Sequence, residues 1–381
     1  MKLLYFIPAL YNSGGMERVV TQKVNSLVRD FSHDITIVTT EQLGKPNFYP
    51  LADKIRVIHL DINFAEHLNC NLISKTRKHW AKQKKYRKKV EDIIDKYQPN
   101  ICISTGGKEI EFLSKLKDKS IKMAELHFSK RFREHFLVSR EKTFFWKYLG
   151  QIRTFQLVRS TQKLDKLIVL TKADAEDWNK TNNNVVQIYN PSVVQSEEVA
   201  SVENKKALAV GRLDAQKGFD FLVCAWRLVV NKHPDWILDI WGSGEDYDSL
   251  QRQIADNHLE KNLFLRGVTD NVKNEYLNSS IYVMTSRYEG FPMVLIEAMS
   301  YGLPCVSFDC ECGPKEIIAE EKNGFLVPVG DVVALADRIV TLIEDEKLRK
   351  AMSVSAKENS KRFDLATIMN QWNDLFQEFL K

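Results

Sequence analysis

Short apolar runs alternate with amphipathic helical segments along all 381 residues of this chain, and the alternation limits the folds open to it. Strands that alternate with helices join in parallel, because each crossover helix returns the chain to the same end of the sheet. In the first half we expect strands at residues 2–8, 35–39, 55–60, 101–104, 123–127, 167–170 and 185–188. In the second half we expect them at residues 207–210, 237–241, 263–266, 281–284, 305–308 and 325–327. The pattern predicts an α/β fold with doubly wound parallel sheets.

A polar connector divides this pattern into two Rossmann-like halves. Asn190-Pro191 and residues 195–206 lack the apolar periodicity found on either side. We therefore expect one domain at residues 1–190, a second at 191–362, and a final helix within 363–381, after a break at Phe363-Asp364. A chain of this length can build two cores. Two such halves are expected to face each other across a cleft that binds a ligand.

The formal net charge of +5 is unevenly distributed. Residues 1–190 hold 34 Lys and Arg against 20 Asp and Glu, so the totals of 55 and 50 leave 21 against 30 for the second half. Nine Lys and Arg lie between Lys75 and Lys89, together with Trp80 and Tyr86, and residues 128–155 also mix basic with aromatic side chains. Such segments suit a membrane surface with anionic lipid, although a solvated helix face explains each one singly. Nucleic acid is not the expected partner, because no nucleic-acid-binding signature is present.

The cysteines and the apolar runs indicate a location. Six scattered cysteines without a secretory signal are typical of reduced thiols in the cytoplasm. Cys310 and Cys312 have no second pair nearby, which argues against zinc. No apolar run has the roughly 18 residues of a membrane span. We expect a cytoplasmic protein that could lie peripherally at the inner face of the membrane.

Glycine turns follow several expected strands. Gly14-Gly15 precedes a helix, where glycine would let the backbone approach a phosphate, although a plain turn is an alternative. Between Gly211 and Gly218, Arg212 and Lys217 could neutralise a diphosphate, the arginine by its planar fork and the lysine as a point charge. Surface charge at a helix start explains the same residues. The order of residues is not that of an ATPase phosphate loop.

Two carboxylates lie eight positions apart near the expected strand 281–284. Glu289 belongs to the loop after this strand, and Glu297 to the helix that follows Pro292. Ligands of open α/β sheets bind where strands end and helices begin, so both carboxylates could reach a polyhydroxylated ligand. A helix with two solvated glutamates fits the spacing equally well.

Four motifs of the second half together resemble those of family 4 of the retaining glycosyltransferases, which have the GT-B fold. They are Gly211-Arg212 with Lys217-Gly218, Glu289 with Glu297, Gly302-x-Pro304, and residues 324–327, Gly-Phe-Leu-Val. The match runs through most of residues 205–345. The first half is similar only in residues 14–18 and, less closely, in residues 125–127, Glu-Leu-His.

The resemblance implies a nucleotide-sugar donor, held mainly by the second domain. Position by position, Glu297 would bind the ribose hydroxyls, Arg212 and Lys217 the diphosphate, and Glu289 would face the donor hexose. Gly14 and Gly15 would close over the distal phosphate. His127 matches a histidine near the donor sugar in some members, and a structural role is its alternative. The remaining donor-binding positions implied are Gly290, Phe291, Met293 and Val294.

The expected chemistry is the breaking of a glycosyl–diphosphate bond, in which charge builds on the departing phosphates. Cations fixed beside those phosphates stabilise the transition state. Arg212, Lys217 and Glu289, with His127, are the candidate catalytic residues. No persuasive metal-binding Asp-x-Asp is present, so neither a metal nor another cofactor is expected. The resemblance implies retention of configuration, for which displacement on the same face, assisted by the leaving phosphate, is one mechanism. Pro292 stands where many relatives have a glycine, which puts one backbone contact to the donor in doubt.

The expected substrates are a nucleotide sugar with UDP as the nucleotide, carrying a hexose or N-acetylhexosamine, and a saccharide or lipid-linked saccharide acceptor in surface polysaccharide or cell-envelope glycan synthesis. Two alternatives are open. Another GT-B enzyme, such as a sugar-nucleotide epimerase or a phosphorylase, would share the two domains. A non-catalytic sugar-nucleotide sensor would keep Glu297 but have no need of Glu289 or the cation pair.

Overall fold

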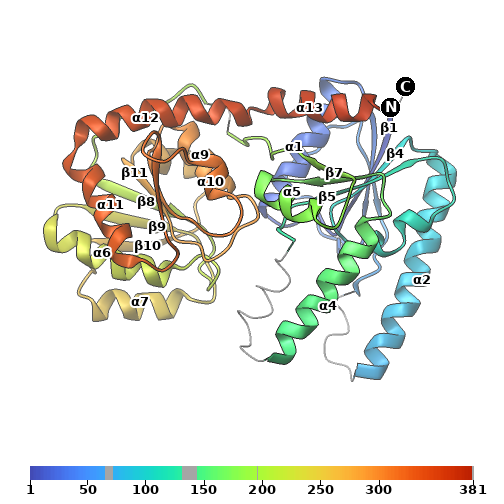
Figure 1. Ribbon diagram of the computed structural model, residues 1–381, viewed down its shortest axis with the longest axis horizontal. Helices are drawn as coiled ribbons and strands as arrows, with labels where there is room; N and C mark the ends of the chain where they lie inside the picture. Colours follow the sequence, from blue (N-terminus) through green and yellow to red (C-terminus); the bar gives the residue numbers. More distant parts are fainter. Residues whose placement is uncertain (65–71, 131–143, 195, 380–381) are drawn as a thin grey trace. The chain divides into compact units, whose positions relative to one another are not determined.

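Two parallel sheets organise the computed structural model, which describes residues 1–64, 72–130, 144–194 and 196–379 (Figure 1). The first sheet contains, in spatial order, β3 (Arg56–His59), β2 (Asp34–Thr39), β1 (Lys2–Ile7), β4 (Ile101–Ser104), β5 (Ile121–Leu126), β6 (Lys166–Val169) and β7 (Val185–Gln187). The second contains β10 (Leu263–Gly267), β9 (Ile237–Trp241), β8 (Lys206–Val210), β11 (Ile281–Met284), β12 (Cys305–Phe308) and β13 (Gly324–Val327). The predicted strands are confirmed, with ends shifted by one or two residues.

The strand order changes direction once in each sheet. From β1 the chain adds β2 and β3 on one side, and then crosses to add β4 to β7 on the other. From β8 it adds β9 and β10 on one side, and β11 to β13 on the other. Ligands of doubly wound sheets bind outside the carboxyl ends of the strands at such a reversal. The loops after β1 and β4, and those after β8 and β11, are therefore the places to look for a site.

The chain folds into two compact units. The described residues up to Val193 form the first unit together with the C-terminal helix α13 (Leu365–Gln377), and Val194–Asp364 form the second. The other helices of the first unit are α1 (Gly15–Arg29), α2 (Leu72–Tyr97), α4 (Phe144–Thr161) and α5 (Lys172–Asn179), with 3₁₀ turns at Lys108–Glu111 and Leu113–Lys115. The helices of the second are α6 (Phe219–Lys232), α7 (Tyr247–Asp256), α8 (Val272–Leu277), α9 (Met293–Ser300), α10 (Pro314–Ile317), α11 (Val332–Glu344) and α12 (Glu346–Ser360).

Apolar side chains cover both faces of the first sheet, so its inner strands are largely apolar, although β5 also carries Lys122 and Glu125. Successive side chains of a strand point to opposite faces. Accordingly, Leu3, Tyr5 and Ile7 of β1 pack in one core, whereas Leu4 and Phe6 pack in another. The first core includes the apolar faces of α1 and α13, and these two helices lie in contact.

The break between the last two helices has a local cause. After α12 the chain makes a 3₁₀ turn at Lys361–Phe363, and Asp364 is extended, with φ −56° and ψ 141°. Phe363 is fully buried and packs edge-on against Phe291 at a centroid distance of 5.7 Å. The buried ring anchors the turn from which α13 starts, as the sequence predicted for Phe363-Asp364.

Candidate functional site

The loop after β8 is shaped by glycine. Gly218, the last residue before α6, has φ +63°, and a Cβ there would lie 2.2 Å from the carbonyl oxygen of Thr285, which follows β11. Only glycine permits so close an approach. The hydroxyl of Thr285 donates to the carbonyl oxygen of Lys217 over 3.0 Å. The loops after β8 and β11 are thus held together by a close backbone approach at Gly218 and by the hydroxyl of Thr285.

The loop after β9 packs against the loop after β8 in the same way. A Cβ on Gly242, where φ is +146°, would lie 1.8 Å from the carbonyl oxygen of Gly211. A Cβ on Gly244 would lie 2.2 Å from the carbonyl oxygen of Leu213. These glycines let three loops meet at the carboxyl ends of β9, β8 and β11, beside the reversal of strand order.

Two of the predicted catalytic residues meet at this place. Nζ of Lys217 lies 2.7 Å from Oε1 of Glu289, and the two side chains are 17% and 9% exposed. The hydroxyl of Ser286 donates to the same carboxylate oxygen over 2.6 Å. The acid at the end of β11 is therefore oriented by a cation from one loop and a hydroxyl from its own loop.

Arg212 lies on the same loop as Lys217 but is not part of this pair. Its side chain is 70% exposed and lies 3.1 Å from a carboxylate oxygen of Asp214 and 3.1 Å from the amide oxygen of Gln216. Its guanidinium is thus held at the surface of the loop, where a ligand could draw it away from weak partners.

Sequence reasoning missed the residues that fasten the loops to one another. The side-chain amide of Gln216 donates to the carbonyl oxygen of Tyr288 over 3.1 Å. Arg287 forms two hydrogen bonds with the carboxylate of Asp220, at 3.0 and 2.6 Å, and a third with the carbonyl oxygen of Ala215 at 2.7 Å. The arginine beside Tyr288-Glu289 was a signal for such a pair, but its partner 67 residues away carried no pattern of its own.

The second predicted acid lies inside the helix after this loop. Glu297 of α9 is buried and accepts a hydrogen bond of 3.2 Å from the hydroxyl of Tyr276, which is on α8. The ring of Tyr276 stacks on that of Tyr301 at a centroid distance of 5.3 Å. Glu297 is thus not a solvated surface residue. Its predicted contact with ribose remains a prediction.

The other predicted donor-binding residues lie around the start of α9. Gly290, Met293 and Val294 are partly exposed, whereas Phe291 is 6% exposed and packs in the interior. Phe291 can therefore offer a ligand only its backbone. Gly313 lies against this segment, because a Cβ there would come within 2.3 Å of the Pro292 ring.

In the first unit, Gly14 and Gly15 begin α1 directly after β1 and its turn. The side chain nearest Gly14 is that of Glu17, whose Oε2 would lie 2.3 Å from a Cβ on Gly14. Glu17 accepts a hydrogen bond from Asn12 over 3.2 Å. Nothing lies within 4 Å of a Cβ built on Gly15. The helix start is open at Gly15, but a carboxylate stands beside the predicted phosphate position.

His127 follows β5 at the carboxyl edge of the same sheet. Its side chain is 6% exposed, and Nε2 lies 3.2 Å from Oε1 of the fully buried Glu125. Within the described residues, no group of three or more His, Cys, Asp and Glu could hold a metal ion.

The second unit matches a known family. Residues 194–359 fit the family model described as glycosyl transferases group 1. The second unit carries a glycosyl transferases group 1 domain. This domain contains Arg212, Lys217, Glu289 and Glu297, and it ends within α12.

Relatives match beyond this domain, over almost the whole chain. A Haemophilus influenzae protein named only as a glycosyltransferase is 27% identical, covering 98% of this chain and 99% of that protein. The amylovoran biosynthesis glycosyltransferase AmsD of Erwinia amylovora is 28% identical, with the same coverage of both chains. Among solved structures, S. aureus TarM in complex with fondaparinux, α-GlcNAc-glycerol and UDP has a TM-score of 0.77 at 18% identity, covering 98% of this chain and 99% of that one. The chain has the GT-B fold expected from the motifs.

Proposed function

We propose that this chain is a retaining, metal-independent glycosyltransferase of family 4. It transfers a hexose or N-acetylhexosamine from a nucleotide-diphosphate sugar, with UDP as the nucleotide, to a saccharide or lipid-linked saccharide acceptor in surface polysaccharide or cell-envelope glycan synthesis. The observation that carries the proposal is the contact of 2.7 Å between Lys217 and Glu289, framed by glycine turns at the reversal of strand order in the second unit.

The contact suits a donor whose leaving group is a diphosphate. Negative charge builds on the phosphates as the glycosyl bond breaks, and a cation already fixed there stabilises this charge without reorganising. Lys217 is such a cation, because Glu289 holds its ammonium group in place. Arg212, on the same loop and 70% exposed, can turn from Asp214 to a second phosphate oxygen. Together the two side chains would take the part that a divalent metal has in other transferases.

Glu289 has a second proposed role, which is to bind the donor sugar. Its Oε1 already accepts from Ser286 and Lys217, so Oε2 is the oxygen that could accept from a hydroxyl of the donor hexose. An acid placed there would orient the sugar and share the positive charge that develops at its reacting carbon. Glu297, deeper in α9, would accept from the ribose hydroxyls in the same way.

Two comparisons support the choice of substrates. The TarM structure is a complex that includes UDP, and the E. amylovora relative is named for the biosynthesis of amylovoran. We take from them a UDP-sugar donor and a polysaccharide product for this chain.

A membrane role for the first unit rests on α2. On the described part of this helix, Arg77, Lys78, Lys84 and Lys85 are exposed, and Trp80 is 70% exposed. Tyr86 does not belong to this face, because it is fully buried and donates to Glu109 over 3.0 Å. Most of the other basic and aromatic segment, residues 128–155, lies outside the described residues or among side chains that are not described. None of the described helices combines the length and apolar character needed to cross a membrane.

The α2 face can be tested with vesicles. Each cation near an anionic surface contributes about 1 kcal/mol of attraction. We expect the chain to sediment with phosphatidylserine vesicles at low salt and to be released as salt rises. Replacing Arg77, Lys78, Lys84 and Lys85 with Gln should abolish sedimentation. A wild-type chain that stays in the supernatant at low salt would contradict a membrane role.

The transferase proposal is tested first by thermal unfolding with UDP, GDP, ADP and their sugars. A ligand at 100 times its dissociation constant stabilises the folded chain by about 2.7 kcal/mol, so a specific donor should raise Tm clearly. We expect a shift with UDP and one UDP-sugar, also in the presence of a chelator. Incubation of that donor with acceptor saccharides, followed by NMR of the anomeric proton, reads the configuration of the product. If no nucleotide sugar shifts Tm, the proposed function is wrong.

A further inference from the structure

A charged pair is enclosed in the core of the first unit. Lys23 of α1 and Glu125 of β5 form a hydrogen-bonded ion pair, and their side chains are 1% and 0% exposed. Enclosing two charges costs several kcal/mol for each ion, and this cost is offset only by close contacts. Two apolar residues of similar volume would stabilise the unit at least as well. The pair therefore calls for an explanation beyond stability.

Helix α13 completes the surroundings of the lysine. Nζ of Lys23 lies 3.5 Å from the centroid of the Trp372 ring, so the ammonium group has a carboxylate and an aromatic face as neighbours. Burial lowers the pKa of Lys23 to about 8, although Glu125 opposes the change. Burial alone would raise the pKa of Glu125, but Lys23 and His127 outweigh it and hold that pKa at about 2. The carboxylate is thus ionised at neutral pH.

His127 is the other neighbour of this carboxylate. Nε2 lies 3.2 Å from Oε1 of Glu125, close enough for the ring to donate once its angle improves. Hydrogen bonds of this kind are often poorly aligned before a ligand binds. Within the described residues, four buried polar atoms here have no hydrogen-bond partner: Nδ1 and Nε2 of His127, Oε2 of Glu125 and the hydroxyl of Tyr5 on β1. Buried atoms of this kind are rare in folded chains, and together they indicate an arrangement completed by a ligand.

We propose that Glu125 is a positioning residue, which keeps the proton of His127 on Nε2 and so leaves Nδ1 free to accept a hydroxyl of the sugar substrate. Lys23, covered by Trp372, maintains the negative charge that Glu125 needs for this. A carboxylate that fixes one nitrogen of a histidine decides which tautomer the ring adopts. The proposal rests on the proposed function, since it assigns His127 to a sugar. Within the first unit, it gives the residues of α1 and α13 a supporting role without contact to the sugar.

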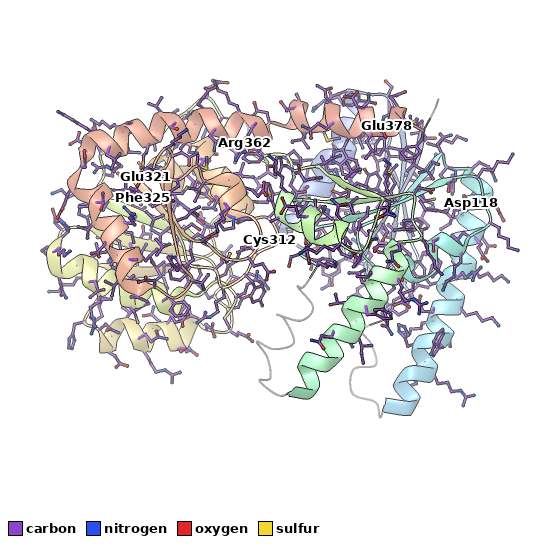
Figure 2. All side chains as sticks on the ribbon, in the orientation of Figure 1. Asp118, Cys312, Glu321, Phe325, Arg362 and Glu378 are labelled. Carbon is purple, nitrogen blue, oxygen red and sulfur yellow. The ribbon has the colours of Figure 1, made fainter. Side chains whose placement is uncertain are left out.

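The alternative is that Lys23 and Glu125 only fasten α1 to β5. The first unit offers a matched pair of that kind. Lys122 lies on the same strand β5, is buried, and pairs at 2.7 Å with Asp118, which is labelled at the right-hand edge of the unit in Figure 2. Lys122→Met removes a buried cation from the same strand without changing the surroundings of His127. It is the control for loss of structure alone.

The variants for the test replace the pair with apolar side chains of similar size. Lys23→Met together with Glu125→Leu leaves no uncompensated charge, so the unit should fold. We expect ¹⁵N NMR of His127, identified among the eight histidines through a His127→Gln variant, to show the Nε2–H tautomer in the wild-type chain and in Lys122→Met. In the double variant we expect both tautomers. The single variant Glu125→Gln keeps an acceptor oxygen at the same place, so the Nε2–H tautomer of His127 should be more populated in it than in the double variant.

Steady-state kinetics gives the second readout. In the double variant kcat should fall by about two-fold to ten-fold, because only the fraction of chains with the Nε2–H tautomer can accept the sugar hydroxyl, while KM for the donor changes less than three-fold. Lys122→Met should keep the wild-type kcat. Two outcomes would overturn this inference while leaving the proposed function intact. One is a double variant that folds and retains the Nε2–H tautomer. The other is an active wild-type chain in which His127 shows no tautomer preference. A wild-type chain with the expected tautomer but no transferase activity would overturn the proposed function instead.

Discussion

Removing the ammonium group of Lys217 is the most direct test of the site. Lys217→Met is preferable to Ala, because the stem of Lys217 covers Gly211, with Cδ only 3.3 Å from a Cβ built there. Loss of one preorganised contact to a developing anion typically costs about 3–4 kcal/mol in the barrier, or 10² to 10³ in kcat. We therefore expect kcat to fall by that factor, with a folded chain.

The stability of this variant can be bounded from the same geometry. An exposed ion pair contributes at most about 1 kcal/mol, and breaking a fully buried pair costs about 3–5 kcal/mol. The side chains of Lys217 and Glu289 are 17% and 9% exposed, and Ser286 still donates to the carboxylate in the variant. We therefore expect Lys217→Met to lower the free energy of unfolding by about 2 kcal/mol, which most folded chains tolerate.

The assay is steady-state transfer from the donor found by thermal unfolding, with urea unfolding of each variant. Lys205→Met is the matched control, because Lys205 lies in the same unit and forms an exposed pair with Asp235. It should leave kcat unchanged and should alter the free energy of unfolding by no more than about 0.5 kcal/mol. Lys217→Met with kcat near that of the wild-type chain would refute the role of the lysine at the diphosphate.

Three further predictions concern other parts of the structure. Glu297→Gln should weaken binding of the nucleotide about ten-fold in calorimetry, because hydrogen bonds to a charged group contribute about 1.5–3 kcal/mol, and unchanged affinity would remove the ribose role. Gly242→Ala should destabilise the second unit by at least 3 kcal/mol in urea unfolding, because the new Cβ would lie 1.8 Å from a carbonyl oxygen, at a φ of +146°. Gly15→Ala is its control, since nothing lies within 4 Å of a Cβ there, and it should not change the free energy of unfolding. The pKa of Glu125 is about 2 in the folded chain, against 4.5 in the unfolded chain. Between these pH values the unfolded chain therefore binds more protons than the folded chain. The free energy of unfolding should fall by up to about 3 kcal/mol as pH drops from 4.5 to 2. In Lys23→Met with Glu125→Leu this part of the pH dependence should be absent.

Local patterns account for most of what could be predicted. A parallel strand between two layers of helices is largely apolar, so most strands stood out from their surroundings in the sequence. Lys217 and Glu289 could be placed near each other because both follow strands of one sheet, and the carboxyl ends of parallel strands share an edge. The order of β8 and β11 as neighbours was not readable from the strands themselves.

Long-range pairs were not predictable. Lys23 has the appearance of a polar residue on an amphipathic helix, and its burial depends on Glu125, 102 residues later, and on Trp372 near the end of the chain. Similarly, Tyr86 was assigned to a surface with Trp80, because both lie among lysines. Helix α2 turns the tyrosine inward, toward Glu109, and the sequence holds no local sign of that partner.

The position of α13 has a consequence for the synthesis of the chain. Its side chains Ile368, Met369, Trp372 and Phe376 belong to the same core as β1 and α1, which the ribosome makes well before α13. Domains usually fold as they emerge, from the N-terminus onward. Here the core of the first unit cannot be completed until α13 has been made, and the apolar face of α1 is uncovered in the meantime. The Val194–Asp364 unit, by contrast, is made in one continuous stretch and can fold before α13 has been made.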